Sequence, residues 1–321
     1  MLNPLKTLNF SSLLLRRTLT LSFSPLIPTT SHHYDELINA AGRSGDFSAV
    51  RRLLNNRWRD GFLNTKFTFN FITSELTALE ETLQTLKYLD IGFAKKGAYD
   101  SLIARLSKLE HTRHALRVAQ IMVSDNVGAN AMSFHPILNY MSRKNNGEAV
   151  GVLKMMRGMK VFPDVTSYNY VLTAYCCDGR LEEAVKVVDE MDENGIVYDS
   201  RTYDALLLGA CKAKRVDGGL VLLRRMVDEG MSTLYSTHIH VINALLKMGY
   251  YGQAVEFVLI YAGTDKALDH ECFGVLARRL ITLKKFDEAK LVLEEMRSRG
   301  LEIEGKLAEA IEMRDGNMGT D

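Results

Sequence analysis

Proline and cysteine are scarce in this sequence, and long apolar runs are missing. Five Pro and four Cys occur among 321 residues, together with 14 Met and 46% hydrophobic residues. Clusters of turn residues, which an all-β fold requires, are also few, so the composition is typical of a helical protein with ample core material. No stretch approaches 18 uninterrupted apolar residues, and no membrane span is expected.

Residue patterns for metal binding and catalysis are also missing. The CxxC spacing of zinc and redox sites is absent from the four cysteines, whose helical surroundings predict reduced core thiols: Cys176, Cys177, Cys211 and Cys272. Two histidine pairs lack carboxylate or cysteine companions at metal-ligand spacing: His111/His114 and His238/His240. No Gly-rich phosphate loop, Ser/His/Asp set or nuclease-like acid cluster occurs. We therefore expect no cofactor, no metal and no enzymatic activity.

Acidic residues are entirely absent from residues 1–30, where Lys6, Arg16 and Arg17 lie among Leu, Ser and Thr. This composition predicts an organellar transit peptide, because an Arg pair interrupts the apolar stretch that a secretory signal would need. The alternative is a disordered tail. The Leu-rich setting of the Arg pair favours the mitochondrion over the chloroplast. The total net charge of +1 is too small to indicate a nucleic-acid partner, so any basic surface must be local.

The segment Val165–Asp199 has the pattern of a helical hairpin. Its first half carries apolar residues at helical spacing, at Tyr168, Val171, Leu172 and Tyr175, and Asp178-Gly179 then breaks the helix. The spacing resumes on a second helix before Asn194-Gly195, at Leu181, Ala184, Val185, Val188 and Met191. Such a short hairpin cannot bury its apolar face alone, so we expect similar neighbours stacked on it.

Seven further segments align with this hairpin in the same register. The eight repeats are 31–65, 66–95, 96–130, 131–164, 165–199, 200–234, 235–269 and 270–304. Residues 66–95 are five residues short and form a degenerate repeat, and residues 305–321 begin a capping helix and then turn polar. The predicted fold is all-α, a right-handed α-solenoid whose first helices line one surface and whose second helices line the other.

The period and motifs of these repeats resemble the pentatricopeptide repeat. The features are the 35-residue length, a Tyr-Asn start, the Gly-Arg-Leu-Glu-Glu-Ala turn of residues 179–184 and a terminal Asp. Residues 270–304, with DEAKLVLEEMRSRG, resemble it nearly as well. The resemblance implies a plant organellar protein that binds single-stranded RNA, with each repeat reading about one base.

In the family, the fifth and last residues of a repeat specify the base. Asn169/Asp199 is a standard pair and would favour uracil. The other polar candidates are Asp100/Asn130, His135/Asp164 and Asp204, whose partner is Leu234. The remaining repeats offer Asp35/Thr65, Asn70/Lys95, Ile239/Asp269 and Gly274/Glu304. Ile and Gly side chains cannot form hydrogen bonds with base edges, so readout along the whole array is in doubt.

A basic residue recurs at the thirteenth position of five repeats, where the first helix ends: Arg43, Lys108, Arg143, Lys212 and Lys247. In a stacked array these residues would form a basic stripe that suits a phosphate chain. The pairs Lys214-Arg215, Arg278-Arg279 and Lys284-Lys285 would widen it. The alternative is that Lys and Arg near helix C-termini merely interact with the helix dipole.

These patterns lead to two functional hypotheses. The first is a non-enzymatic organellar RNA-binding protein that assists splicing, processing, stability or translation of a transcript. The second is a protein-interaction scaffold, for example with splicing-complex proteins or as a structural subunit of the mitochondrial ribosome. The imperfect base-reading pairs and the near-neutral charge favour the second. Neither hypothesis involves a membrane or a small-molecule substrate.

Overall fold

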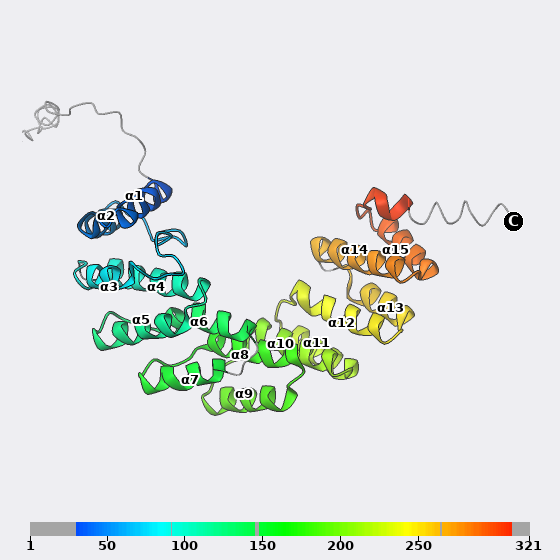
Figure 1. Cartoon of the computed structure of the whole chain (residues 1–321). Coiled ribbons are helices and arrows are strands. Elements are labelled where there is room, and N and C mark those ends of the chain that lie inside the picture. The colour runs from blue at the N-terminus through cyan, green and yellow to red at the C-terminus, as the bar shows by residue number, and fades with distance from the viewer. Residues whose placement is uncertain (1–29, 91, 145–147, 264, 310–321) are drawn as a thin grey trace, which may run out of the picture. The chain divides into compact units, whose positions relative to one another are not determined.

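The computed structural model describes residues 30–90, 92–144, 148–263 and 265–309. The predicted transit peptide lies outside these residues except for Thr30, and so does most of the predicted tail. The chain divides into an N-terminal part, Met1–Ser101, and a C-terminal part, Leu102–Asp321, and each is described by itself. Every regular element of the described residues is a helix, which confirms the predicted all-α solenoid (Figure 1). None of these helices is both long and apolar enough to cross a bilayer.

The N-terminal part contains three complete helices and the start of a fourth: α1 (Ser31–Arg43), α2 (Phe47–Arg59), α3 (Leu79–Lys87) and α4 (Phe93–Lys108). Residues 66–71 form turns, so the degenerate repeat forms only its second helix, α3. A fully buried Arg57 ties these turns to the first hairpin. Its guanidinium donates to Asp35 Oδ1 at 2.7 Å and to Thr68 Oγ1 at 3.2 Å.

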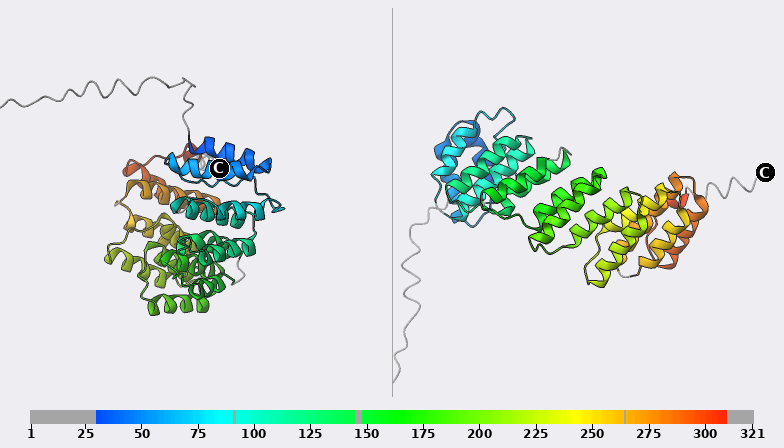
Figure 2. Two further views of the ribbon diagram at one scale, coloured as in Figure 1. Left: turned by 90° about the vertical axis from the view of Figure 1, so that its left-hand side faces the viewer. Right: turned by 90° about the horizontal axis from the view of Figure 1, so that it is seen from below.

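In the C-terminal part, helical hairpins stack in chain order (Figure 2). Its first helices contact one another and form one layer: α6 (Ala131–Arg143), α8 (Val165–Asp178), α10 (Ser200–Lys212), α12 (Tyr235–Lys247) and α14 (Lys266–Thr282). The second helices form the other layer: α5 (Thr112–Ser124), α7 (Glu148–Gly158), α9 (Leu181–Glu193), α11 (Val216–Asp228), α13 (Tyr251–Tyr261) and α15 (Phe286–Ser298). A short helical stretch at 305–309 follows, with Leu307 buried.

In the repeats whose inter-helix turn the structure describes, a residue with positive φ lies between the two helices, for example Gly45, Gly179 and Gly249. Gly179 ends α8 with φ of 73°, a conformation that costs glycine little. At the N-terminus of α14, an aspartate caps the helix. The Asp265 carboxylate accepts hydrogen bonds from the backbone N–H groups of Ala267 and Leu268, so α14 begins about one turn before the predicted repeat boundary at His270.

Most residues of the predicted apolar stripes are buried, with two corrections. Tyr168, Val171, Leu172 and Tyr175 face the core as expected. On α9, however, Val185 is 56% exposed and the buried valine is Val187. Successive residues of a helix point 100° apart, so Val185, which follows the buried Ala184 directly, points away from the buried side of the helix.

The second correction concerns the cysteines. Cys176, Cys211 and Cys272 are buried, whereas Cys177 is exposed, so the prediction of a core thiol is wrong for Cys177. Burial raises the pKa of Cys211 to about 12, which keeps this thiol protonated at neutral pH.

Candidate nucleic-acid interface

The predicted base-reading pair Asn169/Asp199 is brought into direct contact. Asn169 Nδ2 donates to Asp199 Oδ1 at 2.9 Å, and Asn169 is only 5% exposed. Asp199 is the N-cap of α10, where it accepts hydrogen bonds from the backbone N–H groups of Arg201 and Thr202. The Thr202 hydroxyl lies 2.8 Å from Asn169 Oδ1. Both members of the pair are therefore already held by the next repeat.

His135 and Asp164 form a similar pair. His135 Nε2 lies 2.9 Å from Asp164 Oδ1, and Asp164 caps α8 by accepting from the Ser167 backbone N–H and hydroxyl. Burial acts to raise the pKa of Asp164, but the hydrogen bonds from Ser167 and His135 outweigh it and lower the pKa. The carboxylate is therefore charged at neutral pH and serves as an acceptor.

Asp204 forms hydrogen bonds with residues other than its predicted partner, Leu234. Leu234 supplies no polar side chain to the N-cap of α12, so Asp204 accepts instead from Thr237 Oγ1 at 2.8 Å and Ser236 Oγ at 3.0 Å. His240 Nε2 lies 3.7 Å from the same carboxylate. Burial acts to raise the pKa of Asp204, but His240 and Thr237 lower it overall. Asp204 and Leu234 thus do not act together as a polar pair.

Asp100 and Asn130 belong to different parts of the chain. Asp100, on α4 in the N-terminal part, accepts from Lys96 Nζ at 2.5 Å. Asn130 stands at the N-cap of α6, where Ser133 Oγ lies 3.4 Å from the Asn130 backbone nitrogen. In the first repeat, Asp35 is 3% exposed and is occupied by Arg57 and Thr68. Asp35 is therefore part of a structural cluster.

A buried hydroxyl at the third position of a repeat holds the fifth residue of the preceding repeat, and the sequence analysis missed it. The pairs with a hydrogen bond are Asp35–Thr68, Asn169–Thr202 and Asp204–Thr237. The sequence contains a pattern that could have predicted this hydroxyl, namely Asp164-x-x-Ser167 and Asp199-x-x-Thr202. A Ser or Thr three residues after an N-cap Asp can form reciprocal hydrogen bonds with it. Where the fifth residue is Ile239, the corresponding third residue is Cys272.

The five predicted phosphate-binding residues share one structural position. Each is exposed and is the last residue of its helix: Arg43, Lys108, Arg143, Lys212 and Lys247. Both the basic-stripe hypothesis and the helix-dipole alternative predict this position. Lys212 and Lys247 line the same pocket between α10 and α12. The corresponding residue of α8 is Cys177, so the basic series is interrupted between Arg143 and Lys212.

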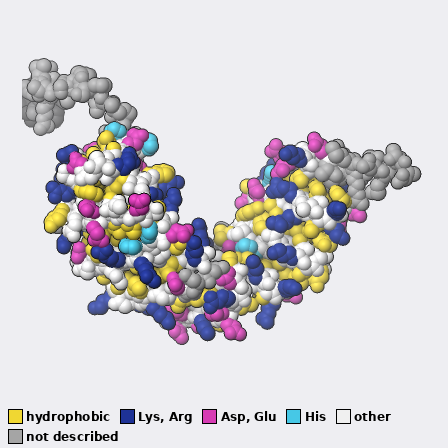
Figure 3. Space-filling view, in the orientation of Figure 1, with side chains coloured by type: hydrophobic (Ala, Val, Ile, Leu, Met, Phe, Trp, Pro, Cys, Tyr) yellow, Lys and Arg dark blue, Asp and Glu magenta, His cyan; other side chains and the backbone are white. Residues whose placement is uncertain are grey.

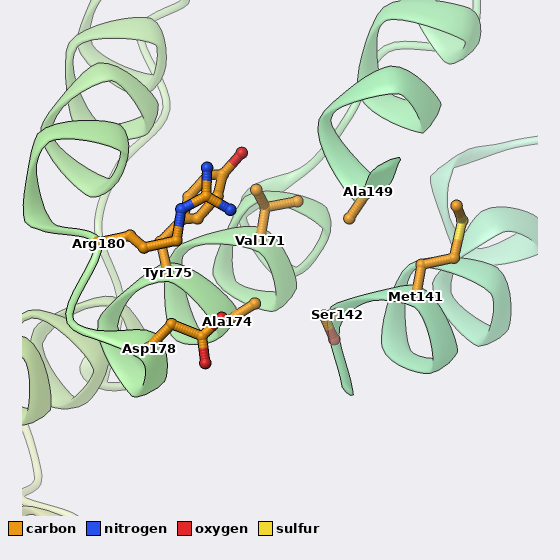
Figure 4. A pocket seen from close by; sticks show the side chains of 8 residues that line it. All are labelled: Met141, Ser142, Ala149, Val171, Ala174, Tyr175, Asp178 and Arg180. Atoms are coloured by element: carbon orange, nitrogen blue, oxygen red, sulfur yellow. The ribbon is translucent and has the colours of Figure 1, made fainter. Parts of the chain in front are cut away.

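Other surfaces are less suited to a ligand. A pocket among α6, α7 and α8, lined by Val171, Tyr175 and Arg180, has a volume of only about 10 Å³, and the Arg180 guanidinium lies over the Tyr175 ring (Figure 4). On the face drawn in Figure 3, Lys and Arg side chains are interspersed with Asp and Glu and with hydrophobic patches. No group of three potential metal ligands occurs within the described ranges.

Comparison with known proteins identifies the family. A mitochondrial pentatricopeptide repeat-containing protein of Arabidopsis thaliana is 45% identical over 319 residues, which cover 95% of this chain and 91% of the relative. The chain belongs to the pentatricopeptide repeat family. A second mitochondrial pentatricopeptide repeat-containing protein of the same plant is 44% identical over 283 residues, covering 87% of this chain and 81% of the relative. The predicted family resemblance and the predicted mitochondrial location are thereby confirmed.

Family models of the pentatricopeptide repeat match the central and C-terminal repeats. The PPR repeat family model matches residues 163–212, the pentatricopeptide repeat domain model 117–178, and the PPR repeat model 201–231 and 272–301. Among solved structures, the pentatricopeptide repeat protein PPR10 in complex with an 18-nt psaJ RNA element is 18% identical, with a TM-score of 0.49. That match covers 87% of this chain and 40% of PPR10.

Proposed function

We propose that this pentatricopeptide repeat protein binds single-stranded mitochondrial RNA on its first-helix layer. In this role it assists splicing, processing, stability or translation of a transcript without catalysis of its own. Membership of the family supports the proposal, because pentatricopeptide repeats read RNA at about one base per repeat. Asn169/Asp199, with His135/Asp164 as a second pair, bias the bases.

The observation that carries the proposal is the shared pocket of Lys212 and Lys247. These two side chains come from consecutive repeats, and neither forms an ion pair with any described residue. The two side chains meet at one pocket because α10 and α12 pack side by side. Two unpaired ammonium groups at one pocket suit successive or shared phosphates of a nucleic-acid strand.

The test is the salt dependence of RNA binding. The double variant Lys212→Glu/Lys247→Glu is expected to weaken binding of single-stranded RNA and to reduce the slope of log affinity against log salt by about 1.4, since each lost phosphate contact contributes about 0.7. Fluorescence anisotropy at several salt concentrations measures both quantities. The matched control is Lys154→Glu/Lys186→Glu, which changes the charge equally on exposed positions of the second helices. Negligible RNA affinity of the wild type at low salt would refute the proposal.

A scaffold function is the second candidate, and a groove on the second-helix layer favours it. A pocket of about 470 Å³ lies between α11 and α13, lined by apolar residues including Leu220, Met248 and Ile260, and Ile260 is 68% exposed. Arg224 lies on the α11 side and Glu256 on the α13 side. The groove therefore suits an amphipathic helix of a partner protein with an acidic residue toward α11 and a basic residue toward α13.

Co-sedimentation with mitochondrial ribosomal subunits tests this candidate. Association that resists high salt and is abolished by Ile260→Glu would support docking through the groove. The partner would then have to bury the glutamate carboxylate at position 260 in an apolar contact, which is energetically costly. Leu291→Glu is the matched control, since Leu291 is a similarly exposed residue of α15 outside the groove. Loss of association at moderate salt, or equal loss in both variants, would contradict it.

A further inference from the structure

Helix α2, in the N-terminal part, carries a concentration of positive charge. It contains four Arg and no Asp or Glu. By contrast, α9 occupies the equivalent place in its own repeat and contains six acidic residues and one Lys. The net charge of the whole chain is only +1, so the basic character of α2 is a local feature.

Helical geometry places the exposed side chains of α2 on one face. Because successive residues point 100° apart, five of them fall within a sector of about 120°: Arg51, Arg52, Asn55, Trp58 and Arg59. Arg57 points to the opposite side, where it is buried against Asp35. The fold therefore buries one arginine of α2 and leaves the other three exposed on a single outer face.

The exposed arginines of α2 lack the partners that other parts of the chain provide. Residues four positions apart on a helix can form ion pairs, as Arg225 and Glu229 do at 2.7 Å. On α2, asparagines stand four positions after both Arg51 and Arg52. Neither of these two arginines forms an ion pair with a residue that the structure describes.

The acidic residues that border α2 are engaged elsewhere. Asp46 caps the helix by accepting a hydrogen bond from a backbone N–H group. Asp60, which follows the helix, accepts a hydrogen bond from Tyr34 on α1. Asp90 pairs with Arg59 at 2.8 Å, but both side chains are more than half exposed, and such a pair contributes little stability. The outer face of α2 therefore keeps an excess of positive charge.

Aromatic side chains lie at the C-terminal end of the same face. Trp58 is the single Trp of the chain and is 41% exposed. Tyr88 directly follows α3, is 65% exposed and precedes Asp90, the partner of Arg59, by two residues. Exposed aromatic rings beside cationic groups suit single-stranded nucleic acid, because unpaired bases stack on the rings and phosphates pair with the cations.

We propose that the outer face of α2 is a second RNA-binding surface, separate from the first-helix layer. Arg51, Arg52 and Arg59 bind phosphates, and an unpaired base stacks on Trp58. This inference goes beyond the proposed function, because α2 is the second helix of its hairpin. Neither interaction distinguishes one base from another, so the surface adds affinity without sequence preference.

A lipid surface is less suitable as the partner. A helix that binds a membrane inserts an apolar face into it. The apolar side of α2 is instead packed in the core, where Val50 is fully buried and Leu54 is 4% exposed. Apart from Trp58, the outer face is polar or charged, which favours a hydrated polyanion.

Fluorescence of Trp58 provides a readout of this face, because the chain contains no other Trp. Titration of the protein with short single-stranded RNA of mixed sequence is expected to quench the Trp58 emission. Arg51→Gln/Arg52→Gln should lower the slope of log affinity against log salt by about 1.4, since each lost phosphate contact contributes about 0.7. Glutamine keeps the helix propensity of arginine, so the unfolding midpoint should not change.

Two further variants complete the experiment. Trp58→Leu is expected to weaken RNA binding by about tenfold through the loss of stacking. The matched control is Lys154→Gln/Lys186→Gln, which also removes two positive charges from exposed positions on second helices. Its salt slope should equal that of the wild type.

Each result decides between distinct conclusions. Quenching that persists in Lys212→Glu/Lys247→Glu supports a separate surface, and its loss there overturns the inference. RNA binding with unchanged Trp58 emission, or an equal slope change in the control, also overturns it while the proposed function stands. Vesicles of phosphatidylcholine and an anionic phospholipid that shift Trp58 emission to shorter wavelength, without any effect of RNA, would assign the face to a membrane. Absence of wild-type RNA binding at low salt refutes the proposed function as well.

Discussion

Asn169 illustrates how single side chains join neighbouring repeats. Its amide bonds both the N-cap Asp199 and the buried Thr202, so one residue of α8 fixes the start of α10. A base that contacts Asn169 must share or replace these hydrogen bonds. Under the proposed function, recognition and repeat stacking are therefore linked at this residue, because the same amide would serve both.

Replacing Asn169 tests this link. Asn169→Ala is expected to lower the free energy of unfolding by about 1 kcal/mol, because one buried hydrogen-bonding group is lost while Thr202 keeps Asp199 as a partner at 3.0 Å. Any preference for uracil at the corresponding position should fall. Urea unfolding and binding to RNAs varied at one position measure the two effects. Thr173→Ala, at an exposed site of the same helix, is the control, and a uracil preference that survives Asn169→Ala would place recognition elsewhere.

At the scale of elements, α8 and α10 approach closely because Gly209 has no side chain. A Cβ atom at Gly209 would lie 2.9 Å from Cys176 Sγ and 3.1 Å from Leu181 Cδ2. Glycine inside a helix normally weakens it, so its presence here serves the packing of the two helices. The second-helix layer shows the opposite case at Gly218, which has no atom within 4 Å of its Cβ position.

These two glycines make a matched pair for mutation. Gly209→Ala is expected to destabilise the protein by roughly 1–3 kcal/mol, because the methyl group overpacks the contact with Cys176. Gly218→Ala should stabilise it by roughly 0.5–1 kcal/mol through helix propensity alone. Chemical denaturation monitored by circular dichroism measures both. A stabilising effect of Gly209→Ala would contradict the close packing.

At the scale of the molecule, the C-terminal part is a linear array in which each hairpin packs mainly on the next. First helices contact first helices of adjacent repeats, and second helices contact the following first helix. Stability in such an array is a sum over repeats and their nearest-neighbour interfaces. A local change should therefore have a local effect.

Hydrogen exchange tests this locality. Phe273 on α14 is fully buried, and Phe273→Ala is expected to remove about 3–5 kcal/mol of local stability. Exchange should accelerate in α12 to α15, while α6 and α8 keep their protection, because no interface connects them directly to α14. Mass spectrometry of exchanged peptides measures the change. Equal loss of protection across all these helices would show that the part unfolds as one unit.

Local patterns in the sequence predicted the helices because apolar spacing, Gly179 and the capping aspartates act within one turn. They failed at Val185 and Cys177, whose burial depends on which side of the helix faces a neighbour. The same distinction applies to the candidate site. The positions of Asn169 and Asp199 in the repeat predicted that they form a pair. The contacts of Asp204 with Ser236, Thr237 and His240 depend on the packing of α12 and could not be predicted from the sequence.

By itself the sequence determined the repeat period, the helical hairpin and the family, because these depend on spacing along one chain. Only the tertiary structure decided which polar side chains are already hydrogen-bonded and which remain unpaired. Asp35 is buried with Arg57, while Asn243 keeps an acceptor without a donor in the pocket between α10 and α12. The physical reason is that hydrogen-bond partners are distant in sequence, 22 residues for Asp35 and Arg57 and 33 for Asn169 and Thr202, so tertiary packing, and not local propensity, brings them within reach.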